Sequence, residues 1–315
     1  MPEGVEVTIL SENLRIILHN TTLTNIKIIG GRYAKKMPTN YVKFKKALPL
    51  KIIDVNNRGK FIYIVFENGW SLWNTLGLSG KWGFKKKKHS AIEFKFKKNY
   101  SPCKNINLDD DEISPTGKKL ISEKDLPYYA PIFELVIPKK VLKSKIFSMY
   151  YSDVRRFGTF AFCDKNECLK KKLKSMKYDI LNDNITLKEF YSVFKRRNIK
   201  NKVITKVLMN PKLFSGIGNY IKAEALYLAR ISPHREAGDL TKSELRKLLL
   251  AIKYVMKLSY KSQYGVYNYL PRIKIGRRQF KFRVYKRKFD SKGNKVKAEK
   301  TEDKRTTYWV PTLQF

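Results

Sequence analysis

The chain starts Met-Pro-Glu-Gly, and these residues could place a nucleophile beside an acid. Pro2 is small enough around Cα for Met1 to be removed, which would leave a free secondary amine next to the Glu3 carboxylate. An α-amine titrates near ~8, far below lysine, so a useful fraction is neutral and nucleophilic at cellular pH. Many proteins start Met-Pro without any such chemistry, and the rest of the chain has to decide between the two interpretations.

Lys60 is a second candidate for chemistry, because it opens an otherwise apolar strand in RGKFIYIVF (58–66). Packing does not require a charge there. When RGK is taken alone, a solvated lysine at a strand end is an equally good explanation.

The stretch KLFSGIGNYIKAEAL (212–226) suggests a phosphate-binding turn. A helix is expected to end near Met209, Gly216 and Gly218 allow a tight turn, and a second helix is expected to start around Asn219. Exposed N–H groups at this helix start, together with the Asn219 amide, would suit a DNA phosphate. An ordinary helical hairpin is the alternative, because Gly-x-Gly alone is weak evidence.

The composition favours a folded protein with a polyanionic partner. A length of 315 residues suffices for one large or two ordinary domains, and 43% hydrophobic residues argue against disorder. Lys and Arg number 67 against 27 Asp and Glu, which leaves a formal net charge of +40. Such a field attracts nucleic acid, with anionic membrane and ribosomal assembly as alternatives. The many Asn and Ile residues also suggest an AT-rich genome, which would raise the lysine content everywhere.

Other classes of protein are disfavoured. No apolar run is long enough for a transmembrane helix, and no basic segment followed by an apolar stretch marks a secretory signal, so an intracellular protein is expected. Three cysteines are too few for a disulfide framework. Cys163 and Cys168 have no second pair nearby, so a four-cysteine zinc site cannot be built.

The first half of the chain is expected to consist mainly of strands after a helix at residues 3–19. A polar stretch at 98–127 interrupts the strands and is expected to be a mobile insert. Short strands with turn signals between them are typical of an antiparallel sandwich or barrel. The strands are expected at 23–29, 50–55, 60–66, 70–76, 91–96, 132–137, 145–151 and 157–163.

The second half changes character around residues 164–185 and is helical from 186 to 262. Thr241 is expected to be the N-cap of the last helix, since Glu244 follows three residues later. The tail from residue 272 is basic, interleaved with Phe and Tyr, and is expected to form a β-hairpin.

Taken together, these motifs resemble the formamidopyrimidine-DNA glycosylase/endonuclease VIII family. GIGNYIKAEALYLARISPH is similar to its helix–two-turn–helix element, and MPEG is similar to its N-terminal signature. Other matches occur in the family's order: RGKFIYIVF (58–66), LGLSG (76–80), DVRRFG (153–158), and the tail FRVYKR (282–287) with RTTYW (305–309). The resemblance covers nearly the whole chain outside the 98–127 insert.

The resemblance implies a bifunctional DNA glycosylase and AP lyase of base excision repair. The Pro2 amine would attack C1′ of the damaged nucleotide, and the resulting iminium would acidify the C2′ proton, so that strand cleavage follows. Glu3 would be the general acid toward the sugar ring oxygen. Lys60 would hold the phosphate and assist β-elimination, and Arg305 would grip the phosphate beside the lesion and assist δ-elimination. Retention of Met1 would turn the nitrogen into an amide and abolish this chemistry.

Everting a base leaves a hole in the duplex, and the resemblance assigns LGLSG and DVRRFG to filling it. Leu78 and Phe157 would enter the stack, and Arg155 would face the orphaned base. Leu78 and Phe157 could instead be core residues. Glu6 also lies at a family site position, although a helix start explains its charge equally well. His89, in a lysine run, is a weak candidate for a phosphate contact.

The implied fold is α+β, with an N-terminal antiparallel β-sandwich and flanking helices. The expected domains are a catalytic domain (1–165), a linker (166–185), a helix–two-turn–helix domain (186–278) and a finger hairpin (279–315). Relatives commonly build the finger around four zinc-binding cysteines, but here Val310 and Leu313 stand where the last two would fall. A zincless finger held by Phe282, Tyr285, Tyr308 and Trp309 is therefore expected, with no metal or other cofactor.

The zincless finger, the MPEG start and the tyrosine-rich connection at 264–277 resemble the endonuclease VIII-like branch. The expected substrates are oxidised pyrimidines, formamidopyrimidines and hydantoins, with 8-oxoguanine poor. The expected partner is damaged DNA, double- or single-stranded, bound by a monomer, with no membrane. A non-catalytic nucleic-acid-binding protein with the same helical element is the main alternative, but it would need neither Pro2, Glu3 nor Lys60. A polyanion-binding structural protein would explain only the charge.

Overall fold

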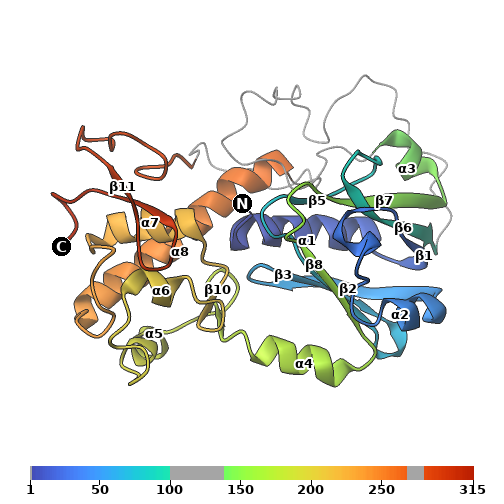
Figure 1. Ribbon diagram of the computed structural model, residues 1–315, viewed down its shortest axis with the longest axis horizontal. Helices are drawn as coiled ribbons and strands as arrows, with labels where there is room; N and C mark the ends of the chain where they lie inside the picture. The colour runs from blue at the N-terminus through green and yellow to red at the C-terminus, as the bar shows by residue number, and fades with distance from the viewer. Residues whose placement is uncertain (1, 100–137, 268–279) are drawn as a thin grey trace. The chain divides into compact units, whose positions relative to one another are not determined.

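The chain folds into two compact units in the computed structural model, which describes residues 2–99, 138–267 and 280–315 (Figure 1). The first unit contains Pro2 and Glu6–Lys172. The second contains Glu3–Val5, Leu173–Tyr264 and the described residues from 280 onward. Most of the expected 98–127 insert, the strand expected at 132–137 and most of the 264–277 connection lie outside the described residues.

The first unit is built on one antiparallel sheet, whose strands follow the β-branched and aromatic runs of the sequence. Among the described residues it has eight strands in the order β5-β7-β6-β1-β2-β3-β4-β8. The strands are β1 (Thr21–Ile28), β2 (Leu50–Arg58), β3 (Phe61–Phe66), β4 (Ser71–Thr75), β5 (Gly80–Gly83), β6 (Ser90–Lys98), β7 (Ile146–Asp153) and β8 (Thr159–Cys163).

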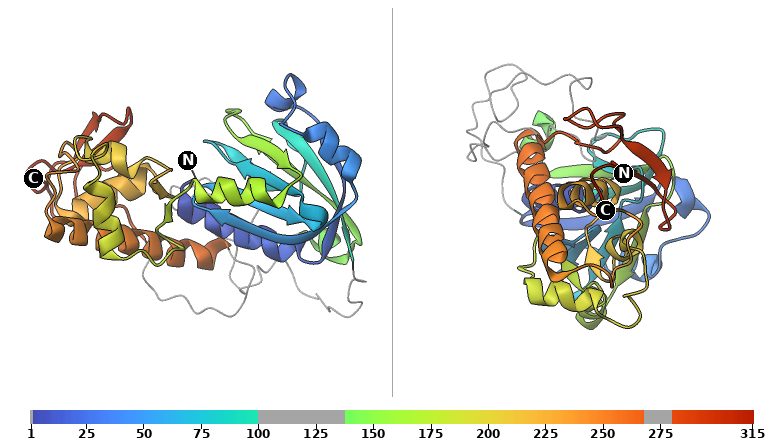
Figure 2. Two further views of the ribbon diagram at one scale, coloured as in Figure 1. Left: turned by 90° about the horizontal axis from the view of Figure 1, so that it is seen from below. Right: turned by 90° about the vertical axis from the view of Figure 1, so that its left-hand side faces the viewer.

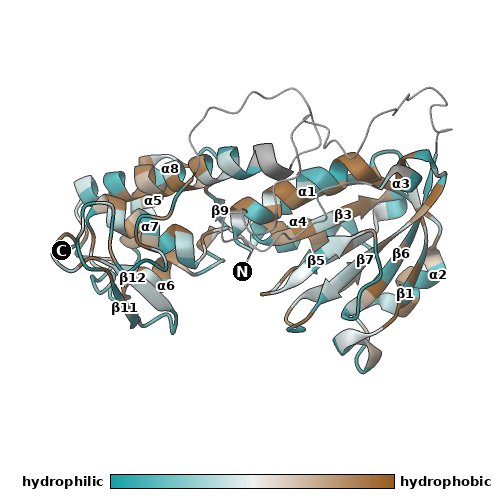
Figure 3. Ribbon diagram, turned by 90° about the horizontal axis from the view of Figure 1, so that it is seen from above, coloured by the Kyte–Doolittle hydropathy of each residue, from teal (hydrophilic) through white to brown (hydrophobic). Residues whose placement is uncertain are grey.

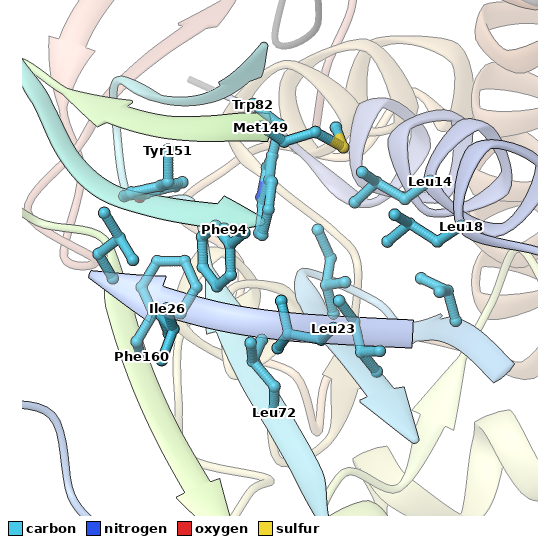
Figure 4. Close-up of a cluster of buried hydrophobic side chains, with 14 of the residues drawn as sticks. Leu14, Leu18, Leu23, Ile26, Leu72, Trp82, Phe94, Met149, Tyr151 and Phe160 are labelled. Atoms are coloured by element: carbon cyan, nitrogen blue, oxygen red, sulfur yellow. The ribbon is translucent and has the colours of Figure 1, made fainter. Parts of the chain in front are cut away.

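The sheet is folded into a sandwich, as predicted. Strands β1 and β2 are joined at only two register pairs, Thr22 with Lys51 and Leu23 with Leu50, so the sheet can turn there (Figures 1 and 2). Side chains from its two halves then meet: the ring of Phe160 in β8 lies 5.9 Å from that of Phe94 in β6 and 6.0 Å from that of Trp82 in β5. Figure 4 shows these rings in one apolar cluster with Leu14 and Leu18 of α1.

Helices and short 3₁₀ turns flank this sheet, and several were not predicted. The short helix α2 was missed because only Tyr41 and Phe44 of its seven residues are buried. Lys98 was assigned to the mobile insert, but it ends β6, and its buried Nζ donates to the carbonyl oxygens of Val141 and Leu142. The elements are α1 (Gly4–Leu18), η1 (Gly31–Ala34), α2 (Tyr41–Ala47), η2 (Glu67–Gly69) and α3 (Lys139–Lys143).

The second unit is helical with two small sheets. The expected linker region, 166–185, contains α4, whose Leu169 is buried, and the short strand β9, which pairs in parallel with β10. The boundary between the units falls within α4 (Asn166–Lys174), after Lys172. The elements that follow are β9 (Tyr178–Asp179), α5 (Leu187–Phe194), α6 (Ile204–Leu208), β10 (Phe214–Ser215), α7 (Asn219–Ala229), α8 (Lys242–Tyr267), β11 (Lys297–Lys300) and β12 (Thr306–Trp309).

Capping boxes mark the starts of α5 and α8 in this unit. Thr241 caps α8 as predicted: its Oγ1 accepts from the Glu244 N–H at 3.2 Å, while Glu244 accepts from the Thr241 N–H at 2.7 Å. Thr186 and Glu189 form the same capping box on α5. Helix α8 carries both hydrophilic and hydrophobic residues along its length, and most of the hydrophobic ones lie on its buried face (Figure 3).

The C-terminal hairpin β11–β12 packs on α7 through an apolar cluster. Ala223 and Tyr227 of α7 meet Val284, Val296 and Val310 there. Of the aromatic residues expected to hold the finger, Tyr285 lies 5.0 Å from Phe282 and 5.2 Å from Tyr308 between ring centroids. Trp309 contacts His234 instead, at 5.3 Å. Apolar and aromatic packing therefore connects the hairpin to the helix.

Candidate functional site

The start of the chain is held by the N-terminus of α7. The Glu3 carboxylate accepts hydrogen bonds from the backbone N–H groups of Tyr220, at 2.9 Å, and Ile221, at 3.3 Å. The first N–H groups of a helix lack partners within the helix and carry its positive end, so they suit a carboxylate. Glu3 is only 2% exposed. The side chain proposed as an acid is thus fixed by backbone groups far away in the sequence.

Glycines make this close approach possible. The Gly4 N–H donates to the Gly216 carbonyl oxygen at 2.8 Å, and a Cβ on Gly4 would lie 2.6 Å from the Gly216 Cα. A Cβ on Gly218 would collide with the Glu3 side chain. Gly216 has φ +95°, which favours glycine. The expectation that these helix-start N–H groups are exposed for a phosphate is wrong for Tyr220 and Ile221, because Glu3 occupies them.

Asn219, the first residue of α7, contacts the finger. Its Nδ2 donates to the Thr306 carbonyl oxygen at 2.8 Å. Its Oδ1 is buried and makes no hydrogen bond within the described structure. One amide proton remains beyond the bond to Thr306, so the side chain retains a donor for a ligand.

The loop that carries Arg305 is fixed by a buried ion pair. Arg305 is exposed and directly precedes β12. Within the same loop, Asp303 accepts from Lys222 Nζ of α7 at 2.6 Å, and both side chains are almost fully buried, at 0% and 4% exposure. Asp303 also accepts from Thr301 Oγ1 at 2.6 Å, and the Thr301 N–H donates to the Arg305 carbonyl oxygen at 3.1 Å. The finger arginine is therefore presented by a loop anchored in α7.

The pKa of Lys222 depends on several of the charged residues in this unit. Burial lowers the pKa of Lys222, and the hydrogen bond and charge of Asp303 oppose this shift. The Arg305 charge lowers the pKa further, and the Glu3 charge raises it. Glu3 and Arg305, from opposite ends of the chain, therefore both influence the pKa of one side chain of α7.

Lys60 lies in the two-residue turn between β2 and β3, not within the strand as expected. The turn is tied to the start of α1: Asn57 Nδ2 donates to Thr8 Oγ1 at 2.9 Å and to the Gly59 carbonyl oxygen at 3.1 Å. Lys60 is half-buried. Pro2, which precedes α1, and Glu6, in its first turn, are buried.

The two loops expected to fill a void lie side by side at one end of the sandwich. Phe157 is 59% exposed, so the alternative that it is a core residue is wrong. Arg155 is also exposed, and Leu78 is half-buried and lies outside the core cluster. A Cβ on Gly77 would lie 2.6 Å from the Phe157 carbonyl carbon, so the loop backbones nearly touch. The His89 side chain is exposed, and its carbonyl oxygen accepts from the Asp153 N–H.

The finger positions at which the last two zinc-binding cysteines were considered carry apolar side chains. Val310 and Leu313 pack against the apolar cluster where the last cysteines would fall. A separate turn before β11 is closed by Asp290, which accepts from the Asn294 N–H at 2.9 Å and from Tyr227 Oη at 2.9 Å. Within the described ranges, no three His, Cys, Asp or Glu side chains gather as a metal site.

Sequence reasoning missed the residues that hold the candidate side chains in place, namely Lys222, Asp303, Ser79 and Asp153. One signal was available for Lys222: with Glu224 it is one of two charges in the largely apolar stretch NYIKAEALYLA. Buried charges of this kind need partners. Glu224 accepts from the N–H groups of Arg283, Val284 and Tyr285, which gives the finger a second attachment to α7.

Comparison with protein families agrees with this arrangement. The N-terminal domain of formamidopyrimidine-DNA glycosylase matches residues 1–109, its helix–two-turn–helix domain matches 169–268, and its C-terminal domain matches 271–315. All three domains occur once and in order. The chain therefore belongs to the formamidopyrimidine-DNA glycosylase family, a class of DNA glycosylases and AP lyases of base excision repair.

Individual relatives are distant in sequence. The chain is 25% identical to the formamidopyrimidine-DNA glycosylase of Rickettsia felis over 261 residues, which cover 81% of this chain and 76% of the relative. It is 24% identical to that of Mycoplasma mobile over 250 residues, 79% of this chain and 74% of the relative. A solved structure of Lactococcus lactis Fpg, a complex with DNA containing an oxidised pyrimidine, matches over 99% of both chains with a TM-score of 0.71 at 21% identity. No helix among the described residues is long and apolar enough to span a membrane.

Proposed function

We propose that the chain excises oxidised bases from DNA through a Schiff base on Pro2 and then cleaves the strand by β,δ-elimination. The observation that carries this proposal is the fixation of Glu3 by α7. A chain start that is held by two backbone N–H groups and by close glycine contacts has a defined place in the molecule. An N-terminal amine next to it is suited to chemistry rather than to solvent exposure.

The residues divide the work as follows. After removal of Met1, the Pro2 nitrogen attacks C1′ and loses its proton, and the bond from C1′ to the base breaks so that the base leaves. The bond from C1′ to the ring oxygen then breaks, its electron pair stays on the oxygen and is protonated, and the opened sugar is left as the iminium. Glu3 provides the acid toward the ring oxygen. The iminium withdraws electrons, so the C2′ proton leaves and the 3′ phosphate is expelled, with Lys60 assisting. Arg305 holds the phosphate beside the lesion for the second elimination.

Borohydride trapping on DNA with an abasic site tests the nucleophile. Mature protein that starts at Pro2 should give a covalent complex, nick the abasic strand and leave mostly β,δ-elimination ends. Glu3→Gln should lose base excision far more than abasic-site cleavage, because the abasic site has no base to expel. If Pro2→Gly traps fully while Lys60→Ala does not, the lysine is the nucleophile and the assignment is reversed.

We propose oxidised pyrimidines, formamidopyrimidines and hydantoins as substrates, in the manner of the endonuclease VIII-like branch. The apolar packing of Val310 and Leu313 in the finger and the tyrosines of the 264–277 sequence support this, because aromatic side chains favour stacking on an everted base. The Lactococcus lactis relative also binds DNA containing an oxidised pyrimidine. Single-turnover excision of thymine glycol should be faster than that of 8-oxoguanine in matched duplexes. The opposite ranking would reject this substrate assignment.

We propose damaged DNA as the partner of a monomer that needs no metal. The charge of +40 supports a polyanionic partner, and affinity should fall steeply with salt, with a log–log slope of about 0.9 per phosphate neutralised. Activity should survive a chelator, and purified protein should contain no stoichiometric zinc. Loss of activity to the chelator would contradict the zincless finger.

A further inference from the structure

The loops LGLSG (76–80) and DVRRFG (153–158) share one carboxylate. Asp153, at the end of β7, accepts from Ser79 Oγ at 2.5 Å through Oδ1 and from the Gly158 N–H at 2.7 Å through Oδ2. Ser79 Oγ in turn accepts from the Arg155 N–H at 2.8 Å. Asp153 is 5% exposed. The carboxylate thus closes its own loop from end to end and joins that loop to the other.

Close packing supports the same junction. A Cβ on either Gly80 or Gly158, at the ends of the two loops, would collide with the buried Tyr151 hydroxyl. The Gly158 carbonyl oxygen accepts from Tyr33 Oη at 3.0 Å. Tyr33 Oη in turn accepts from the Phe160 N–H at 2.8 Å. Both loop ends are therefore fixed to the sandwich by tyrosines, and little space remains for either loop to move alone.

The loop tips contrast with these fixed ends. Val154 and Phe157 are 60% and 59% exposed, although both are apolar. Arg156 has φ +59°, a conformation that a non-glycine residue adopts only when its surroundings impose it. A strained loop that exposes large apolar side chains on a rigid base is arranged to insert into something rather than to stabilise the fold.

We propose that Asp153 and Ser79 are positioning residues that couple the two loops, so that Leu78, Arg155 and Phe157 enter a duplex as one rigid wedge. The inference rests on the proposed function, because a wedge is needed only when a base leaves the stack. Coupling keeps the three side chains in their inserted arrangement before DNA binds, which reduces the ordering cost of insertion. No such hole exists in single-stranded DNA, so the coupling matters for duplex substrates alone.

The test compares borohydride trapping rates on abasic sites in a duplex and in the same strand alone. Ser79→Ala removes the bridge between the loops, and Asp153→Asn removes one acceptor without changing the volume. Each should lower the duplex rate about ten-fold, as the loss of one buried hydrogen bond implies, and leave the single-strand rate unchanged. Ser152→Ala is the matched control, since its hydroxyl bonds to Ser90 at 2.8 Å outside both loops. It should change neither rate.

The outcomes separate the two proposals. Wild-type protein that traps neither substrate contradicts the proposed function. Trapping by wild type, combined with equal losses on both substrates in the Ser79 and Asp153 variants, shows that these residues serve only the fold and overturns the coupling. Unchanged rates in both variants overturn it as well. If Ser79→Ala does not fold, Asp153→Asn decides alone, and 2-aminopurine opposite the abasic site should show a smaller fluorescence change in it than in wild type.

Discussion

Two regions of this protein present an exposed arginine on a loop, and they hold that loop in different ways. Arg155 lies in the 153–158 loop, which is closed by Asp153 through a serine hydroxyl and a backbone N–H. Arg305 follows a loop closed by Asp303 through a threonine hydroxyl and the ammonium group of Lys222. Each loop therefore uses one aspartate and one hydroxyl, and only the finger adds a buried cation.

This difference determines how much each region is destabilised when one partner is removed. Neutral donors satisfy Asp153, so loss of one of them costs about one hydrogen bond, on the order of 1 kcal/mol. Removal of Lys222 leaves the Asp303 charge buried without its cation, and breaking a buried pair typically costs about 3–5 kcal/mol. The finger should therefore fail as a whole, while the loops of the sandwich should lose alignment and keep their fold.

The largest effect is expected from Lys222→Met. The free energy of unfolding, measured with urea, should fall by about 3–5 kcal/mol, because Asp303 stays buried without its cation and keeps the hydrogen bond from Thr301 Oγ1. Replacing Asp303 by Leu in the same chain should restore much of the loss, since a matched apolar pair needs no charge. A double variant as unstable as the single one would contradict the ion pair as the cause.

Lys206→Met is the matched control for that experiment. Lys206 Nζ lies 2.6 Å from Glu302, next to Asp303 in the same loop, but both side chains are about half exposed. An exposed pair contributes less than about 1 kcal/mol. The two lysines should therefore differ clearly, and equal effects would show that burial does not distinguish the pairs.

Gly218→Ala should come next, with an effect on chemistry rather than on the finger. The new Cβ would collide with the Glu3 side chain and displace its carboxylate from the start of α7. A misplacement of about 1 Å can cost about a hundred-fold in rate. Single-turnover excision should fall by that factor while affinity for an abasic-site analogue changes little. Gly293→Ala has open space for its Cβ but is strained at φ +83°, so it should lower stability slightly and leave excision unchanged.

Asn219→Ala should have a smaller effect and link the finger to DNA. It removes the bond to the Thr306 carbonyl oxygen and the remaining amide donor. Affinity should weaken about ten-fold or less on all duplexes alike, because a phosphate contact carries no sequence information. Equilibrium titrations on several sequence contexts measure this. Loss confined to one context would argue against a phosphate partner.

The smallest effect is expected on the free energy of unfolding when the pH is lowered. Burial opposes ionisation of Glu299, but hydrogen bonds from Lys297, His234 and Trp309 lower its pKa from 4.5 to about 2. A carboxyl whose folded pKa is depressed stabilises the fold above its unfolded pKa, and this stability is lost as pH falls from about 4.5 through about 2. In urea unfolding, Glu299→Gln should be less stable than wild type at pH 6, and the difference should shrink toward pH 2. A constant difference would contradict the assignment.

Much of the fold could be predicted from local sequence patterns, because each of these patterns depends on only a few neighbouring residues. The β-branched runs of the sandwich, the Thr241–Glu244 capping box and the glycine turn before Asn219 are of this kind. The prediction that the start of α7 binds a phosphate was partly wrong. Glu3 accepts from the N–H groups there, and it lies 217 positions from Tyr220 in the sequence, too far for a local pattern to indicate the contact. The Lys222–Asp303 and Ser79–Asp153 pairs were missed for the same reason. Motifs identify the candidate side chains, and long-range pairing positions them.

The central claim is that the N-terminal amine, fixed beside Glu3, is the nucleophile. The most direct test is to reduce the complex with abasic DNA, digest it with a protease and a nuclease, and locate the deoxyribose adduct by mass spectrometry. The adduct should lie on the N-terminal peptide that starts at Pro2, with the peptide containing Lys60 unmodified. An adduct on Lys60, or trapping by protein that retains Met1, would contradict the account.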